Sequence, residues 1–141
     1  MIETKFREYL LTIPGITALV VDRIYLEEAE QGATRPYIVI SVDESTHYHH
    51  MTGQCGLAEV DLEVVIAGTT YVNARDVLEA MRIPLSGKIR NVDMGASNAV
   101  NVRTMSLQGF KAATVNPIDG GDQGKRGIIS MWNIVYREPT S

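Results

Sequence analysis

The feature that most constrains the fold is an alternation of apolar and polar side chains over residues 58–64, within a strand-like stretch at 57–67. Every even position from 58 to 66 is Ala, Val, Leu or Ile, whereas three odd positions carry Glu59, Asp61 and Glu63. A period of two residues indicates a strand with one dry and one wet face, as in an antiparallel sheet that is covered on one side only. We therefore expect a sheet that buries one face and exposes these carboxylates on the other.

The rest of the chain adds helices and further strands. Helical spacing predicts a helix over residues 2–13, which Pro14 stops, and a second main helix that begins near Thr70 and ends or kinks at Pro84. Its expected buried stripe is Tyr71, Ala74, Val77, Leu78 and Met81. A short helical stretch is expected over 16–21, strands over 22–26, 37–42, 100–107 and 128–137, and irregular chain over 88–99. The order predicts an α+β fold, with an antiparallel sheet of four to five strands and two main helices packed on one face.

Length and composition indicate one globular domain. The chain has 141 residues, of which 45% are hydrophobic, so we expect residues 1–141 to form a single domain with flexible loops at about 45–56 and 113–127. The formal net charge of −4 disfavours a general nucleic-acid binder. A single cysteine, Cys55, excludes an internal disulfide framework, and no apolar stretch is long enough for a membrane span.

No catalytic or cofactor-binding motif is present. The segment 95–99 lacks the second glycine of a nucleophile elbow, and neither Lys88 nor Lys125 completes a phosphate-binding loop. We therefore expect no enzyme activity and no cofactor.

A group of histidines offers weak candidates for metal ligands. His47, His49 and His50 lie close together, near Met51 and Cys55, in a segment that we expect to form a hairpin tip. Imidazole is the commonest metal ligand, but a zinc site needs three or four ligands that a held backbone brings together. A solvated loop is the simpler interpretation, and a small metal- or ligand-binding domain remains the alternative from another functional class.

Two polar features leave alternatives open. The row of Glu59, Asp61 and Glu63 is either a solvated sheet face or a functional acidic surface. The stretch around Asp119, Asp122, Lys125 and Arg126 superficially matches a calcium loop but lacks the alternating oxygen ligands of that motif. A long connection of this kind is often functional, commonly as an arm that binds a partner.

The first 87 residues resemble a known family. The segments Asp22-Arg23-Ile24-Tyr25, Gln31-Gly32-Ala33 and Pro36-Tyr37 form a block that, together with the Pro-Gly stop of the first helix, is similar to the tail-completion proteins of long-tailed bacteriophages. These proteins are also called tail terminators or tail-to-head joining proteins. From Lys88 onward only the layout of strand, loop and strand agrees, and Pro84 interrupts a helix that the family usually continues.

The resemblance implies a non-enzymatic part of a virion. Such proteins form a ring, usually a hexamer, which caps the head-proximal end of the tail tube, ends tube growth and joins the tail to the head. The implied partners are further copies of the chain, the major tail-tube protein and a head-neck (head-completion) protein, with genomic DNA passing through the lumen without specific binding and no membrane involved. Assembly would take place in the cytoplasm of the bacterial host. The nearest alternative is another neck or tube subunit, such as a head-completion adaptor.

The same implication gives roles to the polar features. Glu59, Asp61 and Glu63 would face the lumen and repel DNA phosphates. The two long loops would dock on neighbours, through His47, Tyr48, His49 and His50 in the first loop and through Asp119, Asp122, Lys125 and Arg126 in the second.

Overall fold

A computed structural model describes residues 2–27, 34–50, 53–95, 100–113 and 127–137. The helices are α1 (Ile2–Leu10), α2 (Pro14–Val20) and α3 (Tyr71–Leu85). The strands are β1 (Ile24–Leu26), β2 (Tyr37–His50), β3 (Gly53–Ala67), β4 (Val92–Met94), β5 (Val100–Ala113) and β6 (Gly127–Arg137). They form one sheet in the order β1-β2-β3-β6-β5-β4, in which β1 runs parallel to β2 and all other neighbours are antiparallel.

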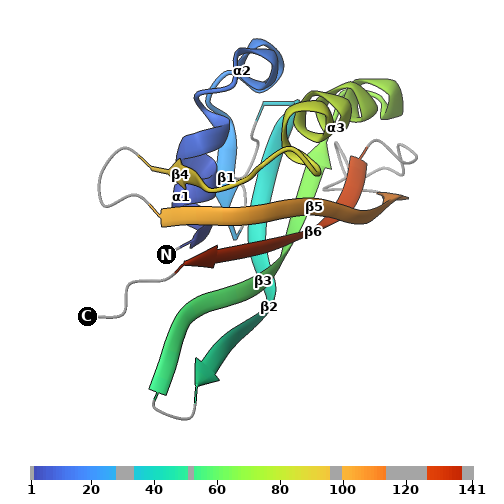
Figure 1. Ribbon diagram of the computed structural model, residues 1–141. Helices are drawn as coiled ribbons and strands as arrows, with labels where there is room; N and C mark the ends of the chain where they lie inside the picture. The colour runs from blue at the N-terminus through green and yellow to red at the C-terminus, as the bar shows by residue number, and fades with distance from the viewer. Residues whose placement is uncertain (1, 28–33, 51–52, 96–99, 114–126, 138–141) are drawn as a thin grey trace.

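The sheet is strongly twisted and is covered by helices on one side (Figure 1). In the view of Figure 1, β5 and β6 run across the molecule, whereas β1 and β2 run upright behind them. Helix α1 packs against β1, β2 and β4, while α3 packs against β3, β5 and β6. The other face of the central strands has no helix over it among the described residues.

The helices follow from spacing and local capping. In α1, Ile2, Phe6 and Leu10 recur every four residues and are all buried, so one stripe of the helix faces the sheet. Pro14 opens α2, where its missing N–H costs no hydrogen bond. Helix α3 starts at a reciprocal cap, because Thr70 Oγ1 accepts from the Asn73 backbone N–H and Asn73 Oδ1 accepts from that of Thr69.

The core lies between the helices and the covered sheet face. The even residues of β3 from 58 to 66 are at most 1% exposed: Ala58, Val60, Leu62, Val64 and Ile66. Trp132 on β6 is fully buried beside them, and its indole N–H donates to Ser130 Oγ at 3.1 Å. The predicted buried face of β3 is confirmed, whereas the three carboxylates on its other face are half-buried rather than exposed.

The structure corrects the predicted fold in several details. The sheet has six strands rather than four or five, and three helices accompany it. The added strand is β4, within the stretch expected to be irregular; its three residues are too few for a period to show. Strand β1 is parallel to β2, a pairing that depends on the path of residues 27–36 and not on side-chain pattern. Tyr71 is 40% exposed and lies outside the buried stripe of α3.

Element ends also differ from the prediction. Helix α3 continues one residue beyond Pro84, which occupies its last turn. Strands β2 and β3 extend to His50 and from Gly53, so most of the stretch expected as a hairpin tip over 45–56 is paired strand. Strand β5 continues to Ala113, six residues past the predicted end. No helix among the described residues has the length and apolar character that crossing a membrane requires.

Candidate functional site

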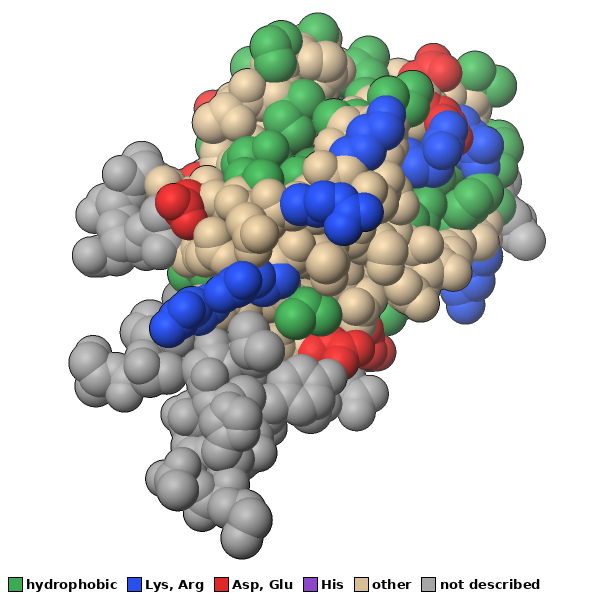
Figure 2. Space-filling model, viewed as in Figure 1, with side chains coloured by type: hydrophobic (Ala, Val, Ile, Leu, Met, Phe, Trp, Pro, Cys, Tyr) green, Lys and Arg blue, Asp and Glu red, His purple; other side chains and the backbone are tan. Residues whose placement is uncertain are grey.

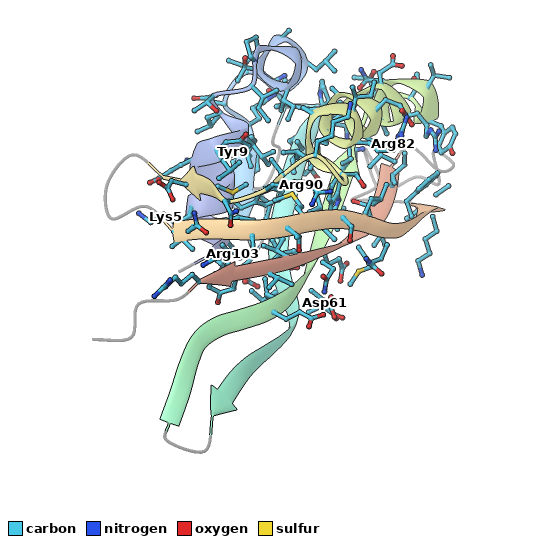
Figure 3. The ribbon with its side chains drawn as sticks, viewed as in Figure 1. Lys5, Tyr9, Asp61, Arg82, Arg90 and Arg103 are labelled. Carbon is cyan, nitrogen blue, oxygen red and sulfur yellow. The ribbon has the colours of Figure 1, made fainter. Side chains whose placement is uncertain are left out.

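The three predicted carboxylates share the uncovered face of β3. Glu59, Asp61 and Glu63 are half-buried and lie opposite Val135, Asn133 and Met131 of β6. Asn133 Nδ2 donates to Glu59 Oε1 at 2.7 Å and to Asp61 Oδ1 at 3.0 Å. The structure therefore brings the predicted row together and fixes two of its members through one neutral amide; Figure 3 labels Asp61 at this face.

Apolar side chains continue the same face beyond the acidic row. Val65 and Val39 lie across the β2–β3 pair, and Ile129 and Met131 continue the face on β6; all four are half-buried. A shallow, open depression of about 380 Å³ lies at the Glu63 end of the row, lined by Glu63, Gly109, Phe110, Lys111, Ile129 and Met131. Such a mixture of acidic and apolar side chains is more typical of a surface that contacts other macromolecules than of a closed small-molecule site.

Beyond the sheet, β2 and β3 project as a two-stranded hairpin arm, which comprises residues 45–50 and 53–56 (Figure 1). Strand β6 pairs with β3 only from Leu57 onward, and β1 pairs only with residues 38–40 of β2. The arm therefore has two long backbone edges without a neighbouring strand among the described residues, an arrangement suited to reaching another subunit.

The predicted histidines lie on this arm. His47, His49 and His50 pair through their backbones with Ala58, Gln54 and Gly53. The register shifts between His47 and His49, which interrupts the alternation that would place both side chains on one side of an undistorted strand. The side chains of these histidines and of Tyr48 lie outside the described residues, so their metal-ligand and docking roles stay predictions. Elsewhere in the described chain, no group of three or more His, Cys, Asp or Glu could hold a metal ion.

The second predicted docking loop is not described by the structure. Asp119, Asp122, Lys125 and Arg126 all fall within residues 114–126, outside the described ranges. Their proposed role in docking therefore stays a prediction.

A basic surface at the β4–β5 edge was missed from the sequence. The segment that follows α3 runs along β5, because the Gly87 N–H donates to Met105 O and Arg103 Nη1 donates to Asn91 Oδ1. This arrangement places exposed Lys88 and Arg90 beside half-buried Arg103. Figure 2 shows Lys and Arg side chains gathered on this side of the molecule, and Figure 3 labels Arg90 and Arg103 there. The three are separated by up to 15 positions in sequence, so only the fold reveals the cluster.

A second group of charges lies on the outer side of α3. Glu79 accepts from Arg82 at 2.6 and 2.9 Å and from Arg75 at 3.2 Å. The hydrogen bond from Arg82 is the main cause that lowers the pKa of Glu79 below its usual 4.5. Burial opposes this shift, and the positive charges of Arg82 and Arg75 add to it. The same hydrogen bond raises the pKa of Arg82. Arg75 also lies over the Phe110 ring, 4.5 Å from its centre, which ties α3 to the end of β5.

Comparison with known proteins connects this fold to virus-like particles. The chain matches a solved chain from the virion of a native gene transfer agent particle, with a TM-score of 0.59 over 93% of each chain and 14% sequence identity. At this identity the likeness establishes a shared fold. A search of the curated proteins found no match.

The family assignment comes from sequence. Residues 4–116 match the model of a family described as tail completion protein gp17, and this range extends past the 87 residues that carry the resemblance noted above. The matched range includes α1 to α3 and β1 to β5, with the acidic row, the hairpin arm and the basic edge. The chain therefore belongs to the tail completion protein gp17 family.

Proposed function

We propose that this chain is a structural protein of a phage or gene-transfer-agent virion, where it forms a ring that caps the head-proximal end of the tail tube. The ring ends tube growth and joins the tail to the head. The observation that carries the proposal is the family match over residues 4–116. The fold shared with a chain from a gene transfer agent virion agrees with it.

A structural role also fits the surface chemistry. The described residues include an open depression with a mixed polar and apolar lining, and a projecting arm, as expected of a part that binds large partners. The family is one of structural proteins, which supports a protein without catalytic activity.

Within the ring, we assign the uncovered sheet face to the lumen. The row of Glu59, Asp61 and Glu63 would then repel DNA phosphates and allow the genome to pass without adhering. We assign the hairpin arm and the loop at 113–127 to contacts with the tail tube and the neck, and we take six copies as the ring size. The partners are thus the major tail-tube protein, a head-completion protein and copies of the chain itself, assembled in the host cytoplasm.

Deleting the gene from cells that make the particle tests the capping role. A tail terminator predicts separate heads together with tubes that continue past the usual length, because nothing stops subunit addition. A head-completion adaptor, the closest alternative, predicts tails of normal length and defective heads. Electron microscopy of tube lengths separates the two, and particles with normal joined tails would refute both.

A further inference from the structure

The edge of the sheet formed by β1 and β2 carries exposed negative charge. Glu27 directly follows β1, where its backbone N–H donates to Ile40 O at 2.9 Å, and Asp43 lies on β2 just beyond the end of β1. Asp22 precedes β1 at its other end. All three side chains are exposed, and none has an ion pair with a described residue. Two cations lie near β1, and both are half-buried: Arg23 donates to Pro36 O at 2.9 Å, and Arg7 of α1 donates to Ile24 O at 2.6 Å.

The opposite edge, formed by β4, β5 and the segment 87–91, carries the reverse charge. Lys88 and Arg90 are exposed without an ion pair to a described residue, and Arg103 lies beside them. The Nε of Arg103 is buried and has no hydrogen-bond acceptor within the described chain. Asp93 on β4 accepts from Asn101 Nδ2 at 3.0 Å, and Glu8 of α1, near the end of β4, lies 3.9 Å from Lys5 Nζ. Among the described residues, the exposed charges of the first edge are thus three carboxylates, whereas the second edge exposes two cations and one carboxylate beside half-buried Arg103.

We propose that copies of this chain join head to tail, with the acidic β1–β2 edge of one copy against the basic β4–β5 edge of the next. The two edges are the first and last strands of the sheet order, both touch α1, and they do not pair with each other within the described chain. An isologous dimer through either edge would bring like charges together, whereas a heterologous contact pairs opposite charges and repeats around a closed ring.

The proposal rests on the ring of the proposed function and deepens it. If the uncovered sheet face lines the lumen and the helices lie outside, the two sheet edges are the surfaces that remain for the neighbouring subunits. Both edge strands, β1 and β4, are only three residues long, so side-chain charge rather than strand pairing would select the neighbour.

Charge reversal tests the contact in cells that make the particle and lack the native gene. An acidic-edge variant carries Glu27→Lys and Asp43→Lys; a basic-edge variant carries Lys88→Glu and Arg90→Glu. Each variant alone repels itself, and we expect each to yield at least about tenfold fewer joined particles than the native chain. A chain with all four substitutions restores opposite charges at the contact and should recover most of that loss.

Co-expression of the two variants provides an independent rescue. One variant then has two basic edges and the other two acidic edges, so they alternate around a ring with an even number of subunits. Recovery in the four-substitution chain or in the mixture supports the proposal, and the mixture decides the result if the four-substitution chain does not fold. Normal assembly by either variant alone, or failure of both rescues, overturns it.

Two controls keep the result specific. Asp76→Lys reverses an exposed carboxylate on α3, away from both edges, and should leave particle yield unchanged. Thermal melts of each purified variant establish that it folds. If gene deletion itself leaves joined particles, the proposed function fails; if deletion abolishes joining but charge reversal has no effect, only the edge contact fails.

Discussion

Asn133 on β6 donates from Nδ2 to Glu59 Oε1 on β3 at 2.7 Å, across the uncovered face of the sheet, and the same nitrogen donates to Asp61 Oδ1 at 3.0 Å. One neutral amide therefore holds two neighbouring carboxylates without cancelling their charge. A salt bridge at this position would remove negative potential, whereas the amide preserves it.

Neutralising the row tests its assigned place in the lumen. A variant with Glu59→Gln, Asp61→Asn and Glu63→Gln keeps the shape of each side chain and leaves an amide oxygen for Asn133 to bond. We expect normal folding and normal particle yield but slower DNA ejection, because phosphates would no longer be repelled. Asp76→Asn on α3 removes one exposed carboxylate elsewhere and is the control. Unchanged ejection kinetics in the triple variant would contradict the lumen assignment.

The buried hydroxyl of Ser130 makes two hydrogen bonds inside the core. Ser130 is fully buried, donates from Oγ to Val64 O at 2.9 Å and accepts from the Trp132 indole N–H. Ser130→Ala leaves that indole N–H without its partner, so we expect unfolding free energy to fall by about 1–3 kcal/mol in chemical denaturation. Ser106→Ala, which removes a hydroxyl bonded by exposed Gln108, should cost less than about 0.5 kcal/mol. Equal losses in the two variants would refute this role of Ser130.

The charge cluster on α3 predicts a pH-dependent contribution to stability. Because the pKa of Glu79 is lowered in the folded chain, its contribution is present above the usual value of 4.5 and disappears as pH falls through the lowered value. Glu79→Gln should therefore lower the melting temperature slightly at pH 7 and have no effect in strong acid. The effect is small because the cluster is exposed to solvent. A difference that grows as the pH falls would contradict the sign of the shift.

The hairpin arm should be dispensable for folding but necessary for joining. Residues 48–50 and 53–56 have no partner strand other than each other among the described residues, whereas residues 45–47 pair with 58–60 of the sheet. Replacing residues 48–56 by a short turn should therefore leave the core intact. We expect soluble protein with a near-native melting temperature, together with free heads and unjoined tails in particles that carry the shortened chain. Infectious particles at the native yield would rule out a docking role for the arm.

A structural feature can be predicted from this sequence when it depends only on residues that are close together in the chain. The alternation of β3, the stripe of α1 and the cap at Thr70 are local patterns, and the structure confirms them. Strand β4 is three residues long, and the parallel pairing of β1 depends on the path of the intervening chain, so neither leaves a periodic signal.

The candidate surfaces also differ in whether their residues are close together in the sequence. The acidic row lies on one strand and could be predicted from its period alone. The basic edge could not, because Lys88 and Arg103 become neighbours only when the segment after α3 folds along β5. The two sheet edges differ in the sign of their exposed charge. This difference depends on the strand order and cannot be seen in any single segment of the sequence.

The most direct test of the capping role is the position of the protein in the finished particle. Particles labelled with a gold-tagged antibody against this chain should carry gold only at the junction of head and tail in electron micrographs. Label along the tube, at the distal tail tip or absent from intact particles would contradict a ring at the head-proximal end of the tail.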